Sequence, residues 1–100
     1  MNDQTRALFL VVTIKPRPDR RAEAEAQLQS MRRDSLTEPG CVFMHLVQPQ
    51  DDPDNWVMLE MFRSRADWDE HMTQPYNVAG NAVLTDLLRE PSDLRLMDEK

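Results

Sequence analysis

A single carboxylate, Glu60, interrupts an apolar segment that runs from Trp56 to Phe62. Because side chains alternate between the two faces of a strand, Glu60 is expected to share its face with Trp56, Met58 and Phe62. A carboxylate in such surroundings needs a partner, or its pKa rises. His71 follows on a short predicted helix, so the two side chains are expected to meet if Glu60 faces the helices.

This pair predicts proton-transfer chemistry. A carboxylate beside an imidazole orients the ring and favours its protonated form, whereas burial alone favours the neutral ring. In either case a histidine of this kind can abstract a proton near neutral pH. We interpret His71 as the base and Glu60 as the residue that orients it. The alternative is a structural pair that satisfies a buried carboxylate.

Other side chains are candidates for the walls of a pocket. Tyr76 can donate a hydrogen bond into a pocket beside its helix, although packing explains it equally well. His45 is expected to face solvent or the sheet edge, and Cys41 to be a small core residue. The walls of an adaptable apolar cavity are predicted from Trp68, Met58 and Phe62.

The sequence carries no signature of a cofactor. It has no glycine-rich phosphate loop, no nucleophile elbow and no thiol–imidazole spacing. Its two histidines and one cysteine cannot by themselves close a four-ligand zinc site. The acidic run 51–54 lacks the ligand spacing of a calcium loop. We therefore expect neither a cofactor nor a metal.

These residues are positioned by six predicted elements. Strands are predicted over 7–15, 41–47 and 56–62 and around Leu94 and Leu96, and helices over 19–36 and 64–88. The second helical segment begins with a capping-box-like Ser64, restarts at Pro75 and presents an apolar face formed by Val83, Leu84, Leu87 and Leu88. The β-α-β-β-α-β order predicts an α+β, ferredoxin-like domain over residues 6–97, whose antiparallel sheet carries its helices on one face.

Composition excludes several classes of function. A chain of 100 residues, 40% of them hydrophobic, predicts one domain. Its net charge of −6 argues against binding a nucleic acid. There is no apolar run near the roughly 18 residues that a membrane span needs. The single cysteine and the absence of a signal-peptide pattern favour a cytoplasmic setting.

Both faces of the predicted sheet are apolar. The segment 8–14 places Leu8, Leu10, Val12 and Ile14 on one face and Phe9 and Val11 on the other, and segment 56–62 repeats this with Val57, Leu59 and Met61. Helices cover only one face, and a large exposed apolar patch usually marks an interface. We predict a homodimer whose two sheets pack face to face, and the alternative is a monomer with an unusually apolar sheet.

The chain resembles the antibiotic biosynthesis monooxygenase family. The matching segments are Glu38-Pro39-Gly40-Cys41, Leu59-Glu60-Met61-Phe62-Arg63-Ser64 and His71-Met72-Thr73-Gln74-Pro75-Tyr76, and the resemblance spans residues 6–97. It implies a ferredoxin-like dimeric α+β barrel with a pocket between sheet and helices. It also implies the oxidation of quinols or anthrones with O₂ and no cofactor.

The chain departs from the family pattern at several positions. Tyr76 stands where the family often has a second histidine, Met58 where anthrone oxidisers have an amide, and Phe62 where a tryptophan is common. These differences argue against the anthrone reaction. Segment 77–81 lacks the histidine of the haem-degrading relatives, which argues against haem cleavage.

We therefore expect a cofactor-independent monooxygenase that acts on a quinol or a similar polyphenol. Such a substrate loses a proton and then passes an electron to O₂, so the protein supplies only a base, a few donors and a water-poor cavity. One alternative is a non-catalytic dimer that binds a small aromatic ligand as a sensor or carrier. Another is a muconolactone-isomerase-like enzyme that shifts a proton without oxygen.

Overall fold

The computed structural model describes residues 6–100. Its elements are β1 (Leu8–Ile14), the short helix η2 (Pro18–Arg20), α1 (Arg21–Ser35), β2 (Cys41–Val47), β3 (Trp56–Phe62), α2 (Arg65–Met72), α3 (Pro75–Leu87) and β4 (Asp93–Asp98). The strands form one antiparallel sheet in the order β2-β3-β1-β4. This is the predicted α+β, ferredoxin-like arrangement.

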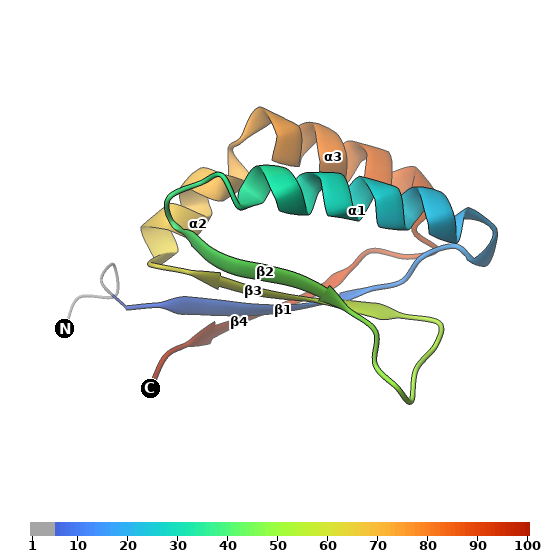
Figure 1. Cartoon of the computed structure of the whole chain (residues 1–100), viewed down its shortest axis with the longest axis horizontal. Coiled ribbons are helices and arrows are strands. Elements are labelled where there is room, and N and C mark those ends of the chain that lie inside the picture. Colours follow the sequence, from blue (N-terminus) through green and yellow to red (C-terminus); the bar gives the residue numbers. More distant parts are fainter. Residues whose placement is uncertain (1–5) are drawn as a thin grey trace.

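The molecule has two layers. All three α-helices lie on one side of the sheet (Figure 1). The buried core lies between the layers, and Leu10 and Phe62 are among its most completely enclosed side chains. The alternation predicted for β1 and β3 is confirmed, because Leu8, Leu10 and Ile14 on β1 and Trp56, Met58 and Phe62 on β3 are buried. Glu60 faces the helices with them.

A β-bulge sets the faces of β2. Cys41 pairs with Phe62 and Phe43 pairs with Met61, so Val42 is an extra residue in the edge strand. From there on, Met44 lies opposite Glu60 on the helix-covered face. Arg32 of α1 donates to the main-chain oxygen of Met44, which fastens this strand to the helix layer.

Local chemistry fixes where the last helices begin. The Ser64 side chain accepts a hydrogen bond from the Asp67 amide at 3.1 Å, which confirms the predicted cap of α2. Pro75 occupies the first turn of α3, where its missing N–H costs nothing. The two glycines allow close packing, because a Cβ on Gly40 would lie 2.5 Å from that of Asp67, and one on Gly80 would lie 2.6 Å from the sulfur of Met31.

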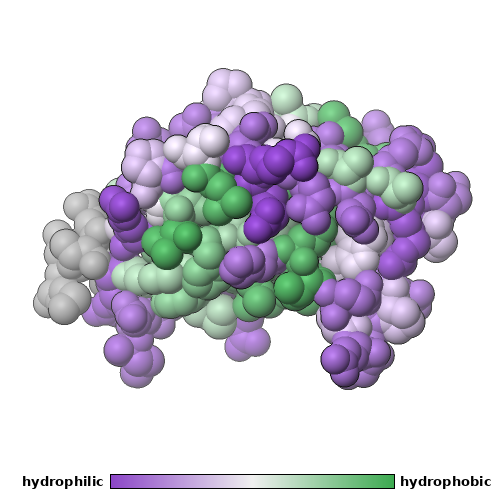
Figure 2. Space-filling view, viewed as in Figure 1, coloured by the Kyte–Doolittle hydropathy of each residue, from purple (hydrophilic) through white to green (hydrophobic). Residues whose placement is uncertain are grey.

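Within residues 6–100, no helix covers the other face of the sheet, the uncovered face (Figure 1). Paired positions on the four strands place apolar side chains there, namely Phe9, Val11, Phe43, Val47, Val57, Leu59, Met61 and Met97. The Phe43 ring stacks on His45, with centroids 5.3 Å apart, and lies 6.4 Å from the Phe9 ring. On the side of the molecule that Figure 2 shows, hydrophobic side chains gather over β2, below the polar outer surface of α1.

One feature differs from the sequence-based expectation, and another was not part of it. Val83 is 48% exposed, and the buried stripe of α3 runs instead through Asn77, Gly80, Leu84 and Leu87. Strand β4 is exposed along its whole length, although Leu94 and Leu96 pair with β1 residues of the helix-covered face. Across residues 6–100, none of the helices combines the length and the apolar character that crossing a membrane requires.

Candidate functional site

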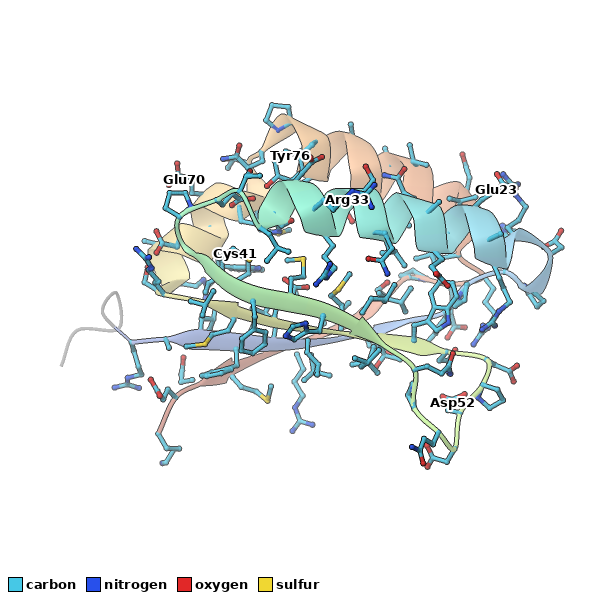
Figure 3. The ribbon with its side chains drawn as sticks, viewed as in Figure 1. Glu23, Arg33, Cys41, Asp52, Glu70 and Tyr76 are labelled. Carbon is cyan, nitrogen blue, oxygen red and sulfur yellow. The ribbon has the colours of Figure 1, made fainter. Side chains whose placement is uncertain are left out.

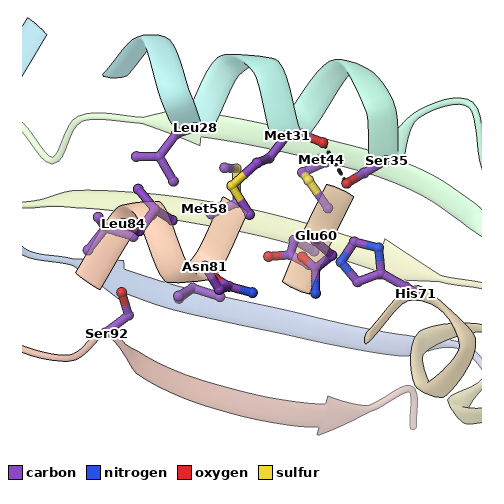
Figure 4. A pocket seen from close by; sticks show the side chains of 13 residues that line it. Leu28, Met31, Ser35, Met44, Met58, Glu60, His71, Asn81, Leu84 and Ser92 are labelled. Atoms are coloured by element: carbon purple, nitrogen blue, oxygen red, sulfur yellow. Dashed lines mark hydrogen bonds between the residues drawn. The ribbon is translucent and has the colours of Figure 1, made fainter. Parts of the chain in front are cut away.

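A cavity of about 120 Å³ lies between the sheet and the helices. Strands β1, β2 and β3 form its floor, and α1, α2, α3 and the segment before β4 form its other walls (Figure 4). Its apolar lining consists of Val12, Ile14, Leu28, Met31, Met44, Met58 and Leu84. Its polar lining consists of Ser35, Glu60, His71, Asn77, Asn81 and Ser92. A cleft that combines apolar walls with polar side chains is typical of a small-molecule site.

Glu60 is the carboxylate of this cavity. It is only 9% exposed, and no hydrogen bond reaches its carboxyl group from any side chain or amide of residues 6–100. Burial disfavours the charged form and raises the pKa of Glu60 to about 7. A carboxyl group with such a pKa is well matched to accepting and returning a proton near neutral pH.

His71 lines the same cavity, and Figure 4 shows it at the same end as Glu60. Its Nδ1 atom lies 2.9 Å from Oε2 of Glu38, and its ring lies 5.0 Å from the ring of Phe62. Both members of the pair are largely buried, with side-chain exposures of 6% and 14%. A carboxylate on one ring nitrogen fixes the orientation and tautomer of the imidazole, which leaves Nε2 for other chemistry.

The sequence-based pairing of Glu60 with His71 is therefore wrong in one respect. The carboxylate bonded to the imidazole is Glu38, so Glu38 rather than Glu60 orients the ring. Glu60 and His71 do line one cavity, as expected, but as two separate polar groups. The carboxyl group of Glu60 faces the cavity and is not engaged by the chain from residue 6 to residue 100.

Of the predicted wall residues, Met58 lines the cavity and two others do not. Phe62 is fully buried behind the imidazole of His71, where it supports the ring. Trp68 packs against the core from α2, and the guanidinium of Arg65 lies 5.0 Å from its ring centroid. Neither side chain reaches a molecule in the cavity, because other residues form the wall there.

Tyr76 lies outside this cavity as well. It lines a separate hollow with Glu38, Gly40, Arg63 and Glu70. Figure 3 shows Tyr76 and Glu70 at the same end of the helical layer. The Tyr76 hydroxyl is buried without a hydrogen-bond partner among residues 6–100, so its donation into a pocket beside its helix stays a prediction, but the pocket concerned is this hollow and not the cavity around Glu60.

Sequence reasoning missed several polar residues of the site. Glu38 had a usable signal, because it lies three residues before Cys41, which pairs with Phe62 at the end of β3, where α2 follows. That connection brings Glu38 and His71 to one end of the sheet. Asn77 had a weaker signal, since it is a polar residue on the buried stripe of α3, whereas Asn81 is an exposed residue at the rim of the cavity and had none.

The remaining candidates have structural surroundings. Cys41 is buried, and desolvation raises the pKa of its thiol to about 11, which makes it a poor nucleophile. His45 is exposed on the uncovered face, as expected. Within residues 6–100, no three side chains of His, Cys, Asp and Glu gather in a way that suits a metal ion.

Comparisons with known sequences place this chain in a wider group. The sequence model of the family described as "Antibiotic biosynthesis monooxygenase" matches residues 7–82. A Mycobacterium tuberculosis protein named "Putative monooxygenase Rv0793" is 31% identical over 87 residues, which cover 87% of this chain and 85% of that protein. A Synechocystis protein named "Uncharacterized protein sll1783" is 29% identical over 83 residues, or 83% of this chain, but the match spans only 56% of its length.

Solved structures show the same fold. The structure of the Mycobacterium tuberculosis protein superposes with a TM-score of 0.88 at 28% identity and covers 94% of this chain and 95% of its own. A Caulobacter crescentus structure described as a "Putative antibiotic biosynthesis monooxygenase" has a TM-score of 0.91 at 21% identity and covers 98% and 92%. At that identity the second likeness shows the fold alone.

Proposed function

Because this chain belongs to the antibiotic biosynthesis monooxygenase family, we propose that it oxidises a quinol or a related aromatic polyphenol with O₂ and without a cofactor. The observation that supports this proposal most is the burial of Glu60 and its raised pKa. A buried carboxyl group that lacks a partner among residues 6–100 and has a pKa near 7 faces an apolar cavity of molecular size. Such a group suits the removal of a proton from a phenol.

In the proposed reaction, ionised Glu60 takes a proton from the phenol, and the resulting anion transfers an electron to O₂. The two radicals combine to form a peroxide at a ring carbon. Loss of water from this peroxide leaves a carbonyl oxygen on the ring and the second oxygen atom in water, and the proton on Glu60 returns to the departing oxygen. The quinol supplies all the electrons, so the balance needs no external reductant.

The other polar residues have supporting roles in this proposal. Glu38 holds His71 through Nδ1, and when the ring carries a proton on both nitrogens, Nε2 donates a hydrogen bond to the oxygen that becomes negatively charged. Met31, Met44 and Met58 form a polarisable, water-poor wall. The predicted catalytic pair is kept, but its roles change: Glu60 is the base and His71 the donor.

We also propose that the protein works as a homodimer formed through the uncovered sheet face. The apolar residues on that face, together with the stacked contact of Phe43 with His45 and its tilted contact with Phe9, support this proposal. Covering about 600 Å² of such a surface contributes on the order of 15 kcal/mol before the costs of association. The cavity lies on the opposite face, so each subunit would retain its own site.

The proposal is tested by oxygen uptake with a panel of substituted hydroquinones, using the wild-type protein, Glu60→Gln and His71→Ala. We expect uptake by the wild type, a loss of about 100-fold or more in Glu60→Gln and a smaller loss in His71→Ala. No uptake with any member of the panel would contradict the proposal. Thermal stabilisation without turnover would then favour the ligand-binding alternative, and conversion in the absence of O₂ would favour the isomerase.

A further inference from the structure

A second, more polar hollow adjoins the cavity around Glu60. This outer hollow has a volume of about 460 Å³ and shares Asn81, Leu84 and Ser92 with the inner cavity. It lies between α3 and the segment before β4, where Arg17, Thr85 and Arg89 line it. A ligand can therefore extend from Glu60, past Asn81 and Ser92, toward the surface.

The inner cavity has room for one ring. Its volume of about 120 Å³ is slightly smaller than the roughly 150 Å³ of an engineered cavity that binds benzene. Its floor and walls belong to three strands and three helices, so widening it means moving packed elements. Fused two- and three-ring systems are thus too large for the position beside Glu60.

The outer hollow offers one cation that the described chain leaves unused. Arg89 is held by the main-chain oxygens of Pro16 and Asp54 and by the Asn55 side chain. Glu90 is paired with Lys15 at 2.6 Å. Arg17 also lines the hollow, and no hydrogen bond or ion pair engages its guanidinium within residues 6–100. A guanidinium in this position is suited to a carboxylate.

We propose that the ligand of this site is a single hydroxylated aromatic ring that bears a flexible arm ending in a carboxylate. The ring occupies the inner cavity beside Glu60, the arm passes Asn81 and Ser92, and the carboxylate meets Arg17. This inference rests on the proposed function for the choice of a phenolic ring. The shape and charge of the ligand follow from the two cavities alone.

The test is anaerobic calorimetric titration, which measures binding without turnover. The probes are hydroquinone, 2,5-dihydroxyphenylalkanoates with one to four methylene groups, their methyl esters and 1,4-dihydroxynaphthalene. We expect the best carboxylate to bind at least ten-fold more tightly than hydroquinone and than its own ester. The fused-ring probe is expected to bind more weakly than hydroquinone.

Two variants and a matched control test whether the carboxylate arm of the ligand lies in the outer hollow. Arg17→Gln should remove the advantage of the carboxylate over its ester and leave hydroquinone binding unchanged, whereas Arg33→Gln, at an exposed arginine of α1, should change neither. Thr85→Trp, at a residue that lines only the outer hollow, should weaken binding of the arm-bearing probes only. Equal affinity for acid and ester, no effect of Arg17→Gln, tighter binding of the naphthalene, or no binding of any probe would each overturn the inference. Binding as expected without any oxygen uptake would contradict only the proposed function.

Discussion

The Nδ1 atom of His71 lies 2.9 Å from Oε2 of Glu38, a residue 33 positions earlier in the chain. The contact joins the first turn of chain after α1 to the last turn of α2. It fixes the imidazole at the end of the cavity where Glu60 also lies. The two acidic residues therefore differ in their surroundings, because Glu38 is bonded to His71, whereas Glu60 faces the cavity without a partner among residues 6–100.

Removing Glu38 should destabilise the protein. In Glu38→Ala the buried Nδ1 group of His71 loses its partner, which costs about 1–3 kcal/mol in the free energy of unfolding. Urea denaturation of Glu38→Ala measures this change. Glu70→Ala is the matched control, since Glu70 lies on the same hollow but is exposed. Equal stabilities of the two variants would contradict a structural role for the Glu38–His71 pair.

The free energy of unfolding of the wild-type protein should decrease as the pH rises, because of Glu60. The raised pKa means that the folded state keeps the Glu60 proton between about pH 4.5 and 7, while the unfolded state releases it. The free energy of unfolding is therefore not reduced by Glu60 below about pH 4.5, the pKa of the unfolded state. It falls as the pH rises from there to about 7. Relative to the wild type, Glu60→Gln should gain up to about 3 kcal/mol across that range and no more above it. Denaturation at several pH values checks this, and a pH-independent difference would contradict a raised pKa.

A side chain at Gly40 should destabilise the protein. The new Cβ in Gly40→Ala would lie 2.5 Å from the Cβ of Asp67, so α2 has to shift at its first turn. We expect a loss of about 1–3 kcal/mol in stability. At Gly80→Ala the obstacle is the flexible end of Met31, so the loss should be smaller, but the displaced thioether should reduce the space beside Glu60. Thermal denaturation compares the two, and a larger loss at Gly80 would argue against this packing.

A charge at the centre of the uncovered sheet face should separate the proposed dimer. Leu59 pairs with Val11 on one side and with His45 on the other, so Leu59→Asp places a carboxylate in the middle of that face. Sedimentation velocity should show a dimer for the wild type and a folded monomer for the variant. Val83→Asp, on the exposed side of α3, is the control and should stay dimeric. A wild type that sediments as a monomer at micromolar concentration would contradict the proposed assembly.

The fold could be predicted because its signals are local and periodic. Alternation on β1 and β3, the cap at Ser64 and the proline at 75 each specify an element without knowledge of its neighbours. The buried stripe of α3 could not be predicted in full. Hydrophobicity alone favours Val83 as a buried residue, whereas the buried positions include the polar Asn77 and the small Gly80.

The site was predicted only in part. Periodicity shows that Glu60 faces the helices, but it cannot show which carboxylate among residues distant in sequence reaches His71. Phe62 illustrates the same limit, since it shares the face of Glu60 but lies behind the imidazole rather than at the cavity. Such assignments depend on how loops place element ends, and the loop after α1 sets the position of Glu38.

The most direct test of the account is the pH dependence of oxygen uptake with the best hydroquinone, measured as kcat/KM for the wild type and Glu60→Gln. If ionised Glu60 is the base, the wild-type value rises with pH and reaches half its maximum near about pH 7. Glu60→Gln should be slower by about 10²–10⁴-fold and lack this rise. A Glu60→Gln protein that keeps the wild-type rate and pH profile would contradict the central claim.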